Sequence, residues 1–287
     1  YRAWNGSRVE RLLATDAPLL EFAPEDTETT APTARLGLRR AFGELYLRSS
    51  AYAGFRPPTL NELHRPFRVG NDVTEANAAL EPERIVGFDV GVGGEHTNWS
   101  WEAGVFATRL DDAIVNVTLG AGPGTFPPGV FVPAGGAYRQ RQNAGAIDAM
   151  GVEAEARGNW SERIGWRVAL NYTDAEFGSG PLAGLRPAQS AEWSASAGVE
   201  WRPLKATTLS AALIYETARF EDDLNGRELD AAAILDLRAE QRLRAGVSVY
   251  AALDNALDAD VETAESGDGI ESFGPPRAFR VGLVLRR

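Results

Sequence analysis

Apolar and polar residues alternate along most of the chain with a period of two. In the run from Val86 to Val92, for example, Val86, Phe88, Val90 and Val92 are separated by small or polar residues, and residues 279–285 repeat the pattern. Such alternation predicts β-strands that have one apolar and one polar face. About thirteen segments of this kind can be counted, which predicts an all-β fold. They include residues 1–4 and 8–13, on either side of a hairpin signal at residues 5–7, and a strand from residue 99 that continues through residues 114–117.

The connections between these segments alternate in length. Long connections rich in Gly, Pro, Asp or Asn, such as residues 119–137, 174–189 and 254–276, follow every second strand, whereas residues 96–98 and 158–162 are short turns. In an antiparallel meander every second connection lies at the same end, so one rim carries long loops and the other tight turns. This asymmetry favours an antiparallel, up-and-down transmembrane β-barrel. A soluble sandwich would mix both lengths at both ends.

Five tryptophans lie within a few residues of the predicted short turns: Trp99, Trp101, Trp160, Trp166 and Trp201. Aromatic residues gathered at one rim are typical of the girdle at a membrane interface. The alternative is that they are ordinary core tryptophans of a β-sandwich.

The predicted polar faces carry many charged side chains, which cannot face a dry core unpaired. They suit a wet lumen, or alternatively the solvent face of a soluble sheet. The set is Arg48, Glu102, Glu153, Glu155, Arg157, Arg167, Asn171, Glu192, Glu200, Asp230, Asp236, Arg238, Arg280 and Arg286.

Composition narrows the possible functions. The 287 residues carry a net charge of -11, which argues against a nucleic-acid partner. The absence of cysteine excludes disulfides and thiolate metal sites within this chain, and His64 and His96 are too few for most imidazole metal sites. No apolar run reaches the roughly 18–20 residues of a membrane helix, but barrel strands need only about 10 alternating residues. The start of the chain, without Met or an export signal, is interpreted as an entry point within a longer protein.

No catalytic constellation is found, so we expect no enzyme activity, cofactor or resident metal. Carboxylates cluster at residues 111–112, 221–223 and 254–260, but no EF-hand pattern accompanies them, which favours solvated loops over Ca²⁺ sites. Neither histidine accompanies a Gly-x-Ser-x-Gly elbow, and the Gly-rich loops lack the Lys-Ser/Thr of a phosphate-binding loop.

Residues 52–84 form the longest connection, about thirty residues, and connections of that length are usually functional. The prolines at 57 and 58 end the preceding strand, because proline lacks an N–H and restricts the residue before it. Two motifs follow, GFRPPTLNEL and NAALEPER, and then a strand that begins VGFDVGV. Their main residues are Phe55, Arg56, Pro58, Thr59, Leu60, Asn61, Glu62, Leu63, Asn77, Leu80, Pro82 and Glu83.

These motifs resemble the late-barrel signature of TonB-dependent outer-membrane receptors. The segments NAGAIDAMGVEAEARGNW, AALDNALDA and GPPRAFRVGLVL resemble later strands of the same family, in the same order. The resemblance implies the C-terminal portion of a barrel of about 22 strands, with the plug domain, the TonB box and the early strands outside this chain. Family members normally end in an aromatic residue, whereas this sequence ends Leu-Arg-Arg, so either residues are cut off or the assembly signal is unusual.

The resemblance further implies a receptor in the outer membrane of a Gram-negative bacterium. It would be surrounded by outer-membrane lipid, energised by the TonB–ExbB–ExbD complex, and would import a scarce nutrient, most often a ferric siderophore or a corrinoid. Loop cations and aromatics are the candidate ligand contacts, since they suit an anionic, partly aromatic metal chelate: His64, Arg65, Phe67, Arg68, Phe126, Phe131, Tyr138, Phe177 and Arg186. The alternatives are a passive porin-like channel and a soluble or surface-anchored β-sheet binding protein.

Overall fold

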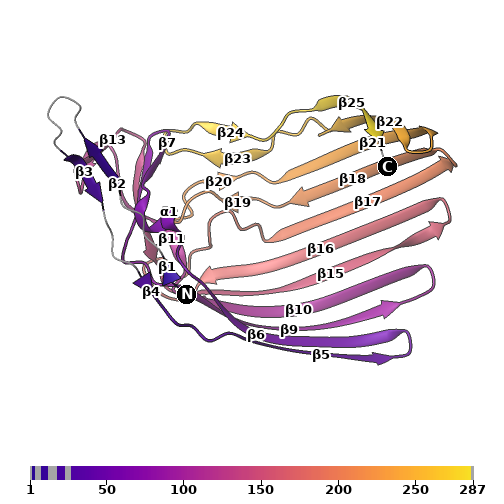
Figure 1. The fold of residues 1–287 in the computed structure, drawn as a ribbon, viewed down its shortest axis with the longest axis horizontal. Coiled ribbons are helices and arrows are strands. Elements are labelled where there is room, and N and C mark those ends of the chain that lie inside the picture. The colour runs from indigo at the N-terminus through magenta and orange to yellow at the C-terminus, as the bar shows by residue number, and fades with distance from the viewer. Residues whose placement is uncertain (1, 4–7, 12–17, 23–26, 286–287) are drawn as a thin grey trace.

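The computed structural model describes residues 2–3, 8–11, 18–22 and 27–285. Its main feature is one antiparallel sheet of eleven strands, in which each strand pairs with the strands that precede and follow it in the meander. Figure 1 shows the sheet as a curved wall of long, tilted strands. The strands are β5 (Ala34–Phe42), β6 (Leu45–Arg56), β9 (Glu83–Glu95), β10 (Trp99–Asp111), β15 (Ile147–Ser161), β16 (Ile164–Phe177), β17 (Trp193–Leu204), β18 (Thr207–Glu216), β21 (Ala232–Arg244), β22 (Val247–Asp254) and β25 (Ala278–Leu285).

The connections sort by length onto the two ends of the sheet, which confirms the predicted asymmetry. One rim, on the right in Figure 1, carries only short turns, at residues 43–44, 96–98, 162–163, 205–206 and 245–246. The opposite rim carries the long loops, at residues 57–82, 112–146, 178–192, 217–231 and 255–277.

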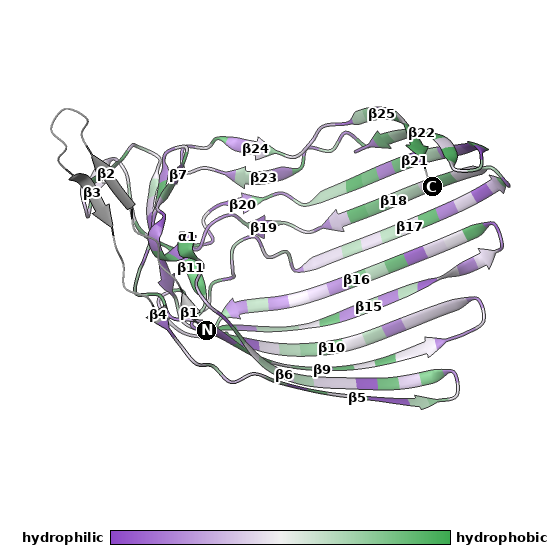
Figure 2. Cartoon of the chain, viewed as in Figure 1, coloured by the Kyte–Doolittle hydropathy of each residue, from purple (hydrophilic) through white to green (hydrophobic). Residues whose placement is uncertain are grey.

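The apolar rows of the sheet face outward and are not covered by a second sheet. Leu38, Met150 and Val281 are 67%, 62% and 70% exposed, although they lie on three different parts of the wall. The alternation of apolar and polar residues is visible along strands such as β16 in Figure 2. Removing apolar surface from water lowers the free energy by about 25 cal/mol per Å². A wall with exposed apolar rows is therefore stable only where lipid replaces water. This arrangement is the predicted transmembrane barrel wall and not a sandwich.

The buried apolar clusters of the described residues lie in the long loops. One contains Val117, Ala144, Phe177 and Leu182, and the other contains Val73, Val132 and Tyr138. Val73, Val117 and Tyr138 belong to a four-stranded sheet of β11 (Ile114–Ala121), β14 (Ala137–Asn143), β8 (Asp72–Glu75) and β7 (Phe67–Val69), in which β8 and β14 are parallel. A short helix, α1 (Leu60–His64), accompanies it.

Short two-stranded sheets complete the described structure. Within the long loops they are β12 (Gly124–Phe126) with β13 (Val130–Val132), β19 (Arg219–Phe220) with β20 (Glu228–Leu229), and β23 (Glu262–Glu265) with β24 (Glu271–Phe273). Near the N-terminus they are β1 (Arg2–Ala3) with β4 (Thr27–Glu28), and β2 (Arg8–Arg11) with β3 (Pro18–Phe22).

Two details of the predicted strands are wrong. The sequence pattern pairs residues 1–4 with residues 8–13, but β1 pairs with β4 and β2 pairs with β3, while the expected turn at residues 5–7 lies outside the described residues. A local turn signal was therefore overridden by longer-range pairing. For the same reason the sheet has eleven strands within residues 34–285, fewer than the segments counted from the pattern.

The strand predicted to run on through residues 114–117 is also interrupted. Asp112 adopts a left-handed backbone with φ 57°, and β11 then leaves the wall for the small sheet. The returning strand breaks at the same level: the Ala144 N–H donates to the Ala113 carbonyl at 2.8 Å, and the Ala113 N–H donates to the Gly145 carbonyl at 2.9 Å. Period-two alternation continues across the break, so the pattern does not mark it.

An arginine on the outward face tests the membrane placement. Val152→Arg replaces an exposed outward valine, and we expect it to destabilise the folded full-length protein in lipid vesicles by about 2–4 kcal/mol if the site lies near the membrane midplane. Ala169→Arg is the matched control, because Ala169 lies opposite Glu155 on the polar face. Equal effects of the two substitutions on urea unfolding in vesicles would contradict the assignment of the faces.

Candidate functional site

The first motif, residues 54–63, builds the entry to loop 57–82, which joins two barrel strands near one edge of the wall. Thr59 begins helix α1 with a capping box, in which Thr59 Oγ1 accepts from the Glu62 N–H at 3.2 Å and Glu62 Oε2 accepts from the Thr59 N–H at 2.6 Å. Pro58 and Leu63 are buried, while Leu60 is half exposed to solvent. The motif therefore has a local structural reason: it stops β6 and starts a one-turn helix.

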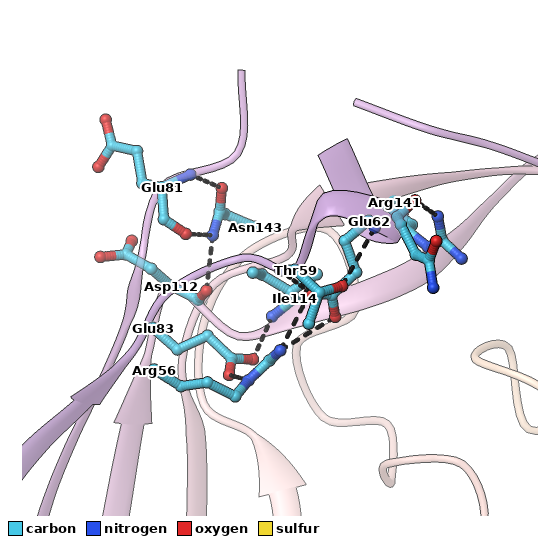
Figure 3. A network of polar contacts seen from close by, with 10 residues as sticks. Arg56, Thr59, Glu62, Glu81, Glu83, Asp112, Ile114, Arg141 and Asn143 are labelled. Atoms are coloured by element: carbon cyan, nitrogen blue, oxygen red, sulfur yellow. Dashed lines mark hydrogen bonds and ion pairs between the residues drawn. The ribbon is translucent and has the colours of Figure 1, made fainter. Parts of the chain in front are cut away.

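Arg56 closes the base of this loop. Its guanidinium binds Glu62 at 3.0 Å and also forms an ion pair with Glu83, so residues from the two ends of the loop are joined (Figure 3). Glu83 is buried, and its second carboxylate oxygen accepts from the Ile114 N–H at 2.7 Å. One buried carboxylate thus ties the first residue of β9 to the first residue of β11.

The second motif fastens the far part of the loop to β14. Asn77 donates to the Arg141 carbonyl at 3.0 Å, and Asn143 exchanges hydrogen bonds with the backbone of Glu81 at 2.9 and 3.0 Å. Arg141 in turn donates to the carbonyls of Asn61 and Arg65. We call this set of contacts, from Arg56 to Asn143, the loop strap.

Much of the loop strap belongs to the two sequence motifs, but its partners on β11 and β14 do not. Asn143 opens a segment that resembles a family strand, whereas Arg141 and the Ile114 N–H carried no signal at all. They could not be found from the sequence because their role depends on β11 and β14 folding away from the wall.

Buried carboxylates fasten other long loops in the same way. Asp223 accepts from the N–H and hydroxyl of Thr118 at 2.7 and 2.6 Å, which joins loop 217–231 to β11. Asp222 accepts from the Gly226 N–H at 2.7 Å and faces Arg227. Burial raises the pKa of the neighbouring Glu221. Among the described residues no group of three or more His, Asp or Glu side chains is arranged to hold a metal ion.

The nine candidate ligand residues are all on the long-loop rim but differ in exposure. Phe177 and Tyr138 are buried in the two apolar clusters, and Phe126 stacks on Tyr138 with ring centroids 4.7 Å apart. Phe67, Arg65 and Phe131 are exposed.

The remaining candidates have defined partners or surroundings within the loops. Arg68 donates to the Phe131 carbonyl at 2.7 Å, and Arg186 pairs with Glu192 at 2.6 Å. Burial lowers the pKa of His64 at the end of α1, which favours its neutral form.

The five predicted girdle tryptophans gather at the opposite, short-turn rim. Trp99 of β10 and Trp166 of β16 both pair with Gly158 of β15, so the two tryptophans lie at the same height on either side of β15. Trp160 is 73% exposed and stacks with Trp166 at 6.0 Å. Trp101 and Trp201 occupy outward positions of β10 and β17 near the same turns.

The polar face of the wall is organised around Arg48. Its guanidinium contacts Asp89 at 2.6 Å, Glu102 at 2.5 Å and Glu153 at 2.8 Å, on three successive neighbouring strands. Glycines make room for the large side chains of β6: a Cβ at Gly87 would lie 2.3 Å from the Tyr52 ring. The pattern is a hydrated ion-pair surface, which suits the interior of a large barrel.

Comparison with known proteins identifies the family. A family model described as TonB-dependent receptor-like, beta-barrel matches residues 9–256. The chain belongs to the TonB-dependent receptor family. It is 25% identical over 225 residues to the vitamin B12 transporter BtuB of Photobacterium profundum. The aligned region covers 78% of this chain and 33% of that protein.

Solved structures of TonB-dependent receptors share the fold. A ferric enterobactin receptor (PfeA) of Pseudomonas aeruginosa superimposes with a TM-score of 0.66 at 17% identity, over 88% of this chain and 40% of the receptor. The ferric-catecholate import receptor Fiu of Escherichia coli K12 gives 0.68 at 12% identity, over 94% and 37%. The chain therefore spans about a third to two fifths of the length of these relatives.

Family membership places the chain in the outer membrane of a Gram-negative bacterium, as a part of a β-barrel. None of the helical segments in the described residues is long and apolar enough to cross a membrane. The relatives found by sequence and by structure are transport receptors.

Removal of the Arg56 guanidinium tests the loop strap. Arg56→Ala leaves the buried Glu83 carboxylate without its cation, which is strongly unfavourable. We expect faster amide hydrogen exchange across residues 57–82 and at Ile114, with the rest of the wall unchanged. Arg84→Ala, at the next exposed position, is the control, and equal exchange in both variants would show that the strap does not hold the loop.

The strap is also expected to weaken in acid. Burial favours the neutral form of Glu62, but hydrogen bonds from Arg56 and Thr59 outweigh it and hold the Glu62 pKa below its ordinary value of 4.5. A carboxyl group whose pKa is lower in the folded than in the unfolded state stabilises the fold at pH values above its unfolded-state pKa. This stabilisation is lost as the pH falls through the folded-state pKa. Exchange at residues 59–65, corrected for intrinsic rates, should rise between neutral pH and about pH 3.

Glu62→Gln provides the comparison for the acid effect. Glutamine cannot ionise, so exchange near α1 in this variant should already be fast at neutral pH and should respond less to acid. An unchanged acid response in the variant would assign the effect to another group.

Proposed function

We propose that this chain is the C-terminal portion of the barrel of an active transport receptor that imports a scarce nutrient across the outer membrane. The plug domain, the TonB box and the early strands would lie in the rest of the protein. Family membership is the observation that carries this proposal. The ion-pair surface around Arg48 supports it, because a charged inner wall suits contact with a polar plug.

Uptake would depend on the inner-membrane TonB–ExbB–ExbD complex acting through the TonB box and the plug. Binding followed by energised movement of the plug requires no bond-making chemistry from the barrel. This is in keeping with the transport receptors among the relatives.

The substrate class that we favour is a ferric siderophore or a corrinoid. The sequence relative is a vitamin B12 transporter, and one structural relative is a ferric enterobactin receptor. On the long-loop rim Arg65, Phe67 and Phe131 combine exposure with a cation or an aromatic ring, which suits an anionic, partly aromatic metal chelate. These three are the first choice among the nine candidate contacts.

Transport assays distinguish this proposal from a passive channel. Cells that carry the full-length protein should take up one member of a panel of radiolabelled ferric siderophores and cyanocobalamin, and deletion of tonB should abolish that uptake. Uptake that persists without TonB and does not saturate would support the porin-like alternative.

The loop contacts can be tested in the same assay. For the substrate that is taken up, the combined variant Arg65→Ala, Phe67→Ala, Phe131→Ala should raise the half-saturating concentration about tenfold, equivalent to about 1.4 kcal/mol of lost binding. Leu204→Ala, an exposed position on the short-turn rim, is the control and should behave as wild type. If the triple variant also binds normally, these residues do not contact the substrate.

A further inference from the structure

We propose that three long loops meet in a latch across the mouth of the barrel, and that this latch opens before a large ligand reaches the inner wall. The loops are residues 57–82, 112–146 and 255–277, and the latch consists of Asn71, Gly135, Gly267 and Asp268. The inference goes beyond the proposed transport function but rests on it, since a gate has meaning only if something passes.

The latch is formed by two hydrogen bonds of the Asn71 amide and a close backbone contact. Asn71 Nδ2 donates to Asp268 Oδ2 at 2.8 Å and lies 3.3 Å from the Ala134 carbonyl, so one amide contacts both other loops. A Cβ on Gly267 would lie 2.1 Å from the Gly135 carbonyl oxygen, and a Cβ on Gly135 would lie 2.9 Å from the Asp268 Cα. Only glycine lets the two backbones approach this closely.

The topology of the wall makes this contact a bridge across the mouth. Loop 57–82 joins β6 to β9, close to the edge strand β5 of the eleven-stranded sheet. Loop 255–277 joins β22 to β25, which is the edge strand on the opposite side. Figure 1 shows the hairpin of β23 and β24 reaching from its edge of the wall to β7. Loops that start near opposite edges of the sheet therefore touch, although most of the strands of the sheet lie between them.

Two of the three loops form a firm platform for the latch. Asp72, next to Asn71, accepts from the Ala137 N–H at 2.8 Å and pairs with Arg139 at 3.1 Å, and β8 runs parallel to β14 beneath. Loops 57–82 and 112–146 are thus joined by buried polar contacts that are costly to break.

The third loop is fastened mainly at its base. Glu262, the first residue of β23, accepts from Arg219 through its carbonyl at 3.0 Å and from the Asp230 N–H through its carboxylate at 2.8 Å. At the tip, between β23 and β24, Ile270 is 62% exposed. Exposed side-chain hydrogen bonds are weak, because water competes for both partners. The hairpin tip is therefore the part that leaves while the platform stays.

Access to the inner wall can be measured without knowing the substrate. Ser194 lines a hollow of about 490 Å³ on the polar face, so Ser194→Cys in the full-length receptor on intact cells serves as a reporter for a bulky maleimide–polyethylene glycol reagent. Gly267→Ala should separate the loops and speed the labelling several-fold. Gly274→Ala, in the same loop but with ordinary contacts 3.5 Å away, should leave the labelling unchanged.

A covalent lock tests the opposite direction. The chain contains no cysteine, so Asn71→Cys with Asp268→Cys can be oxidised to a bridge before the reporter is labelled. The locked receptor should be labelled several-fold more slowly and should transport less, and a reductant should restore both. The control pair Ala264→Cys with Ser272→Cys bridges two directly paired residues of β23 and β24 within one loop, and it should have no effect.

Failure of the latch is distinguishable from failure of the transport proposal. If the Asn71→Cys, Asp268→Cys pair does not cross-link, or if labelling is the same in the locked, Gly267→Ala and parent receptors, the latch is overturned. If labelling responds as expected but no substrate of the panel is taken up, the latch stands and the proposed function fails.

Discussion

The whole structure depends on the exchange of water for lipid along the outward face of one sheet. Every backbone N–H and C=O in the hydrocarbon layer needs a partner within the protein, and an antiparallel meander supplies one between neighbouring strands. The side chains then alternate, so β15 exposes Val152 outward and directs the next residue, Glu153, to the other face, where it contacts Arg48. Because lipid covers the apolar rows, the wall needs no apolar core of its own.

Once the wall is fixed, the two rims have different tasks. The short-turn rim is closed by tight turns, outward tryptophans and ion pairs such as Arg39 with Glu95 and His96 with Glu44. The long-loop rim contains the apolar clusters of the described residues and the buried carboxylates of Asp72, Glu83 and Asp223, which fold the loops into a compact layer. The proposed ligand contacts all lie in this loop layer, whereas the wall provides the frame that holds the loops.

Much of the wall could be predicted from the sequence, because apolar residues at every second position indicate a strand that has one face in contact with lipid or a core. The loop layer could not. Nothing in the sequence shows that β11 leaves the wall at Asp112, or that Arg141 reaches Asn61 and Arg65, since these contacts join residues far apart in the chain. The candidate ligand residues illustrate the same limit: Phe177 and Phe131 have the same side chain, but the structure buries the first and exposes the second.

A quenching scan along β15 tests the central claim most directly. Single fluorescently labelled cysteines at residues 149–156 of the full-length protein in vesicles would be exposed in turn to a lipid-soluble and a water-soluble quencher. The lipid-soluble quencher should act at Met150, Val152, Ala154 and Ala156, and the positions between them should respond to the water-soluble one unless a plug shields them. A lipid-facing barrel wall would be contradicted if the lipid-soluble quencher failed to act at residues 150, 152, 154 and 156, or if quenching showed no period of two along the strand.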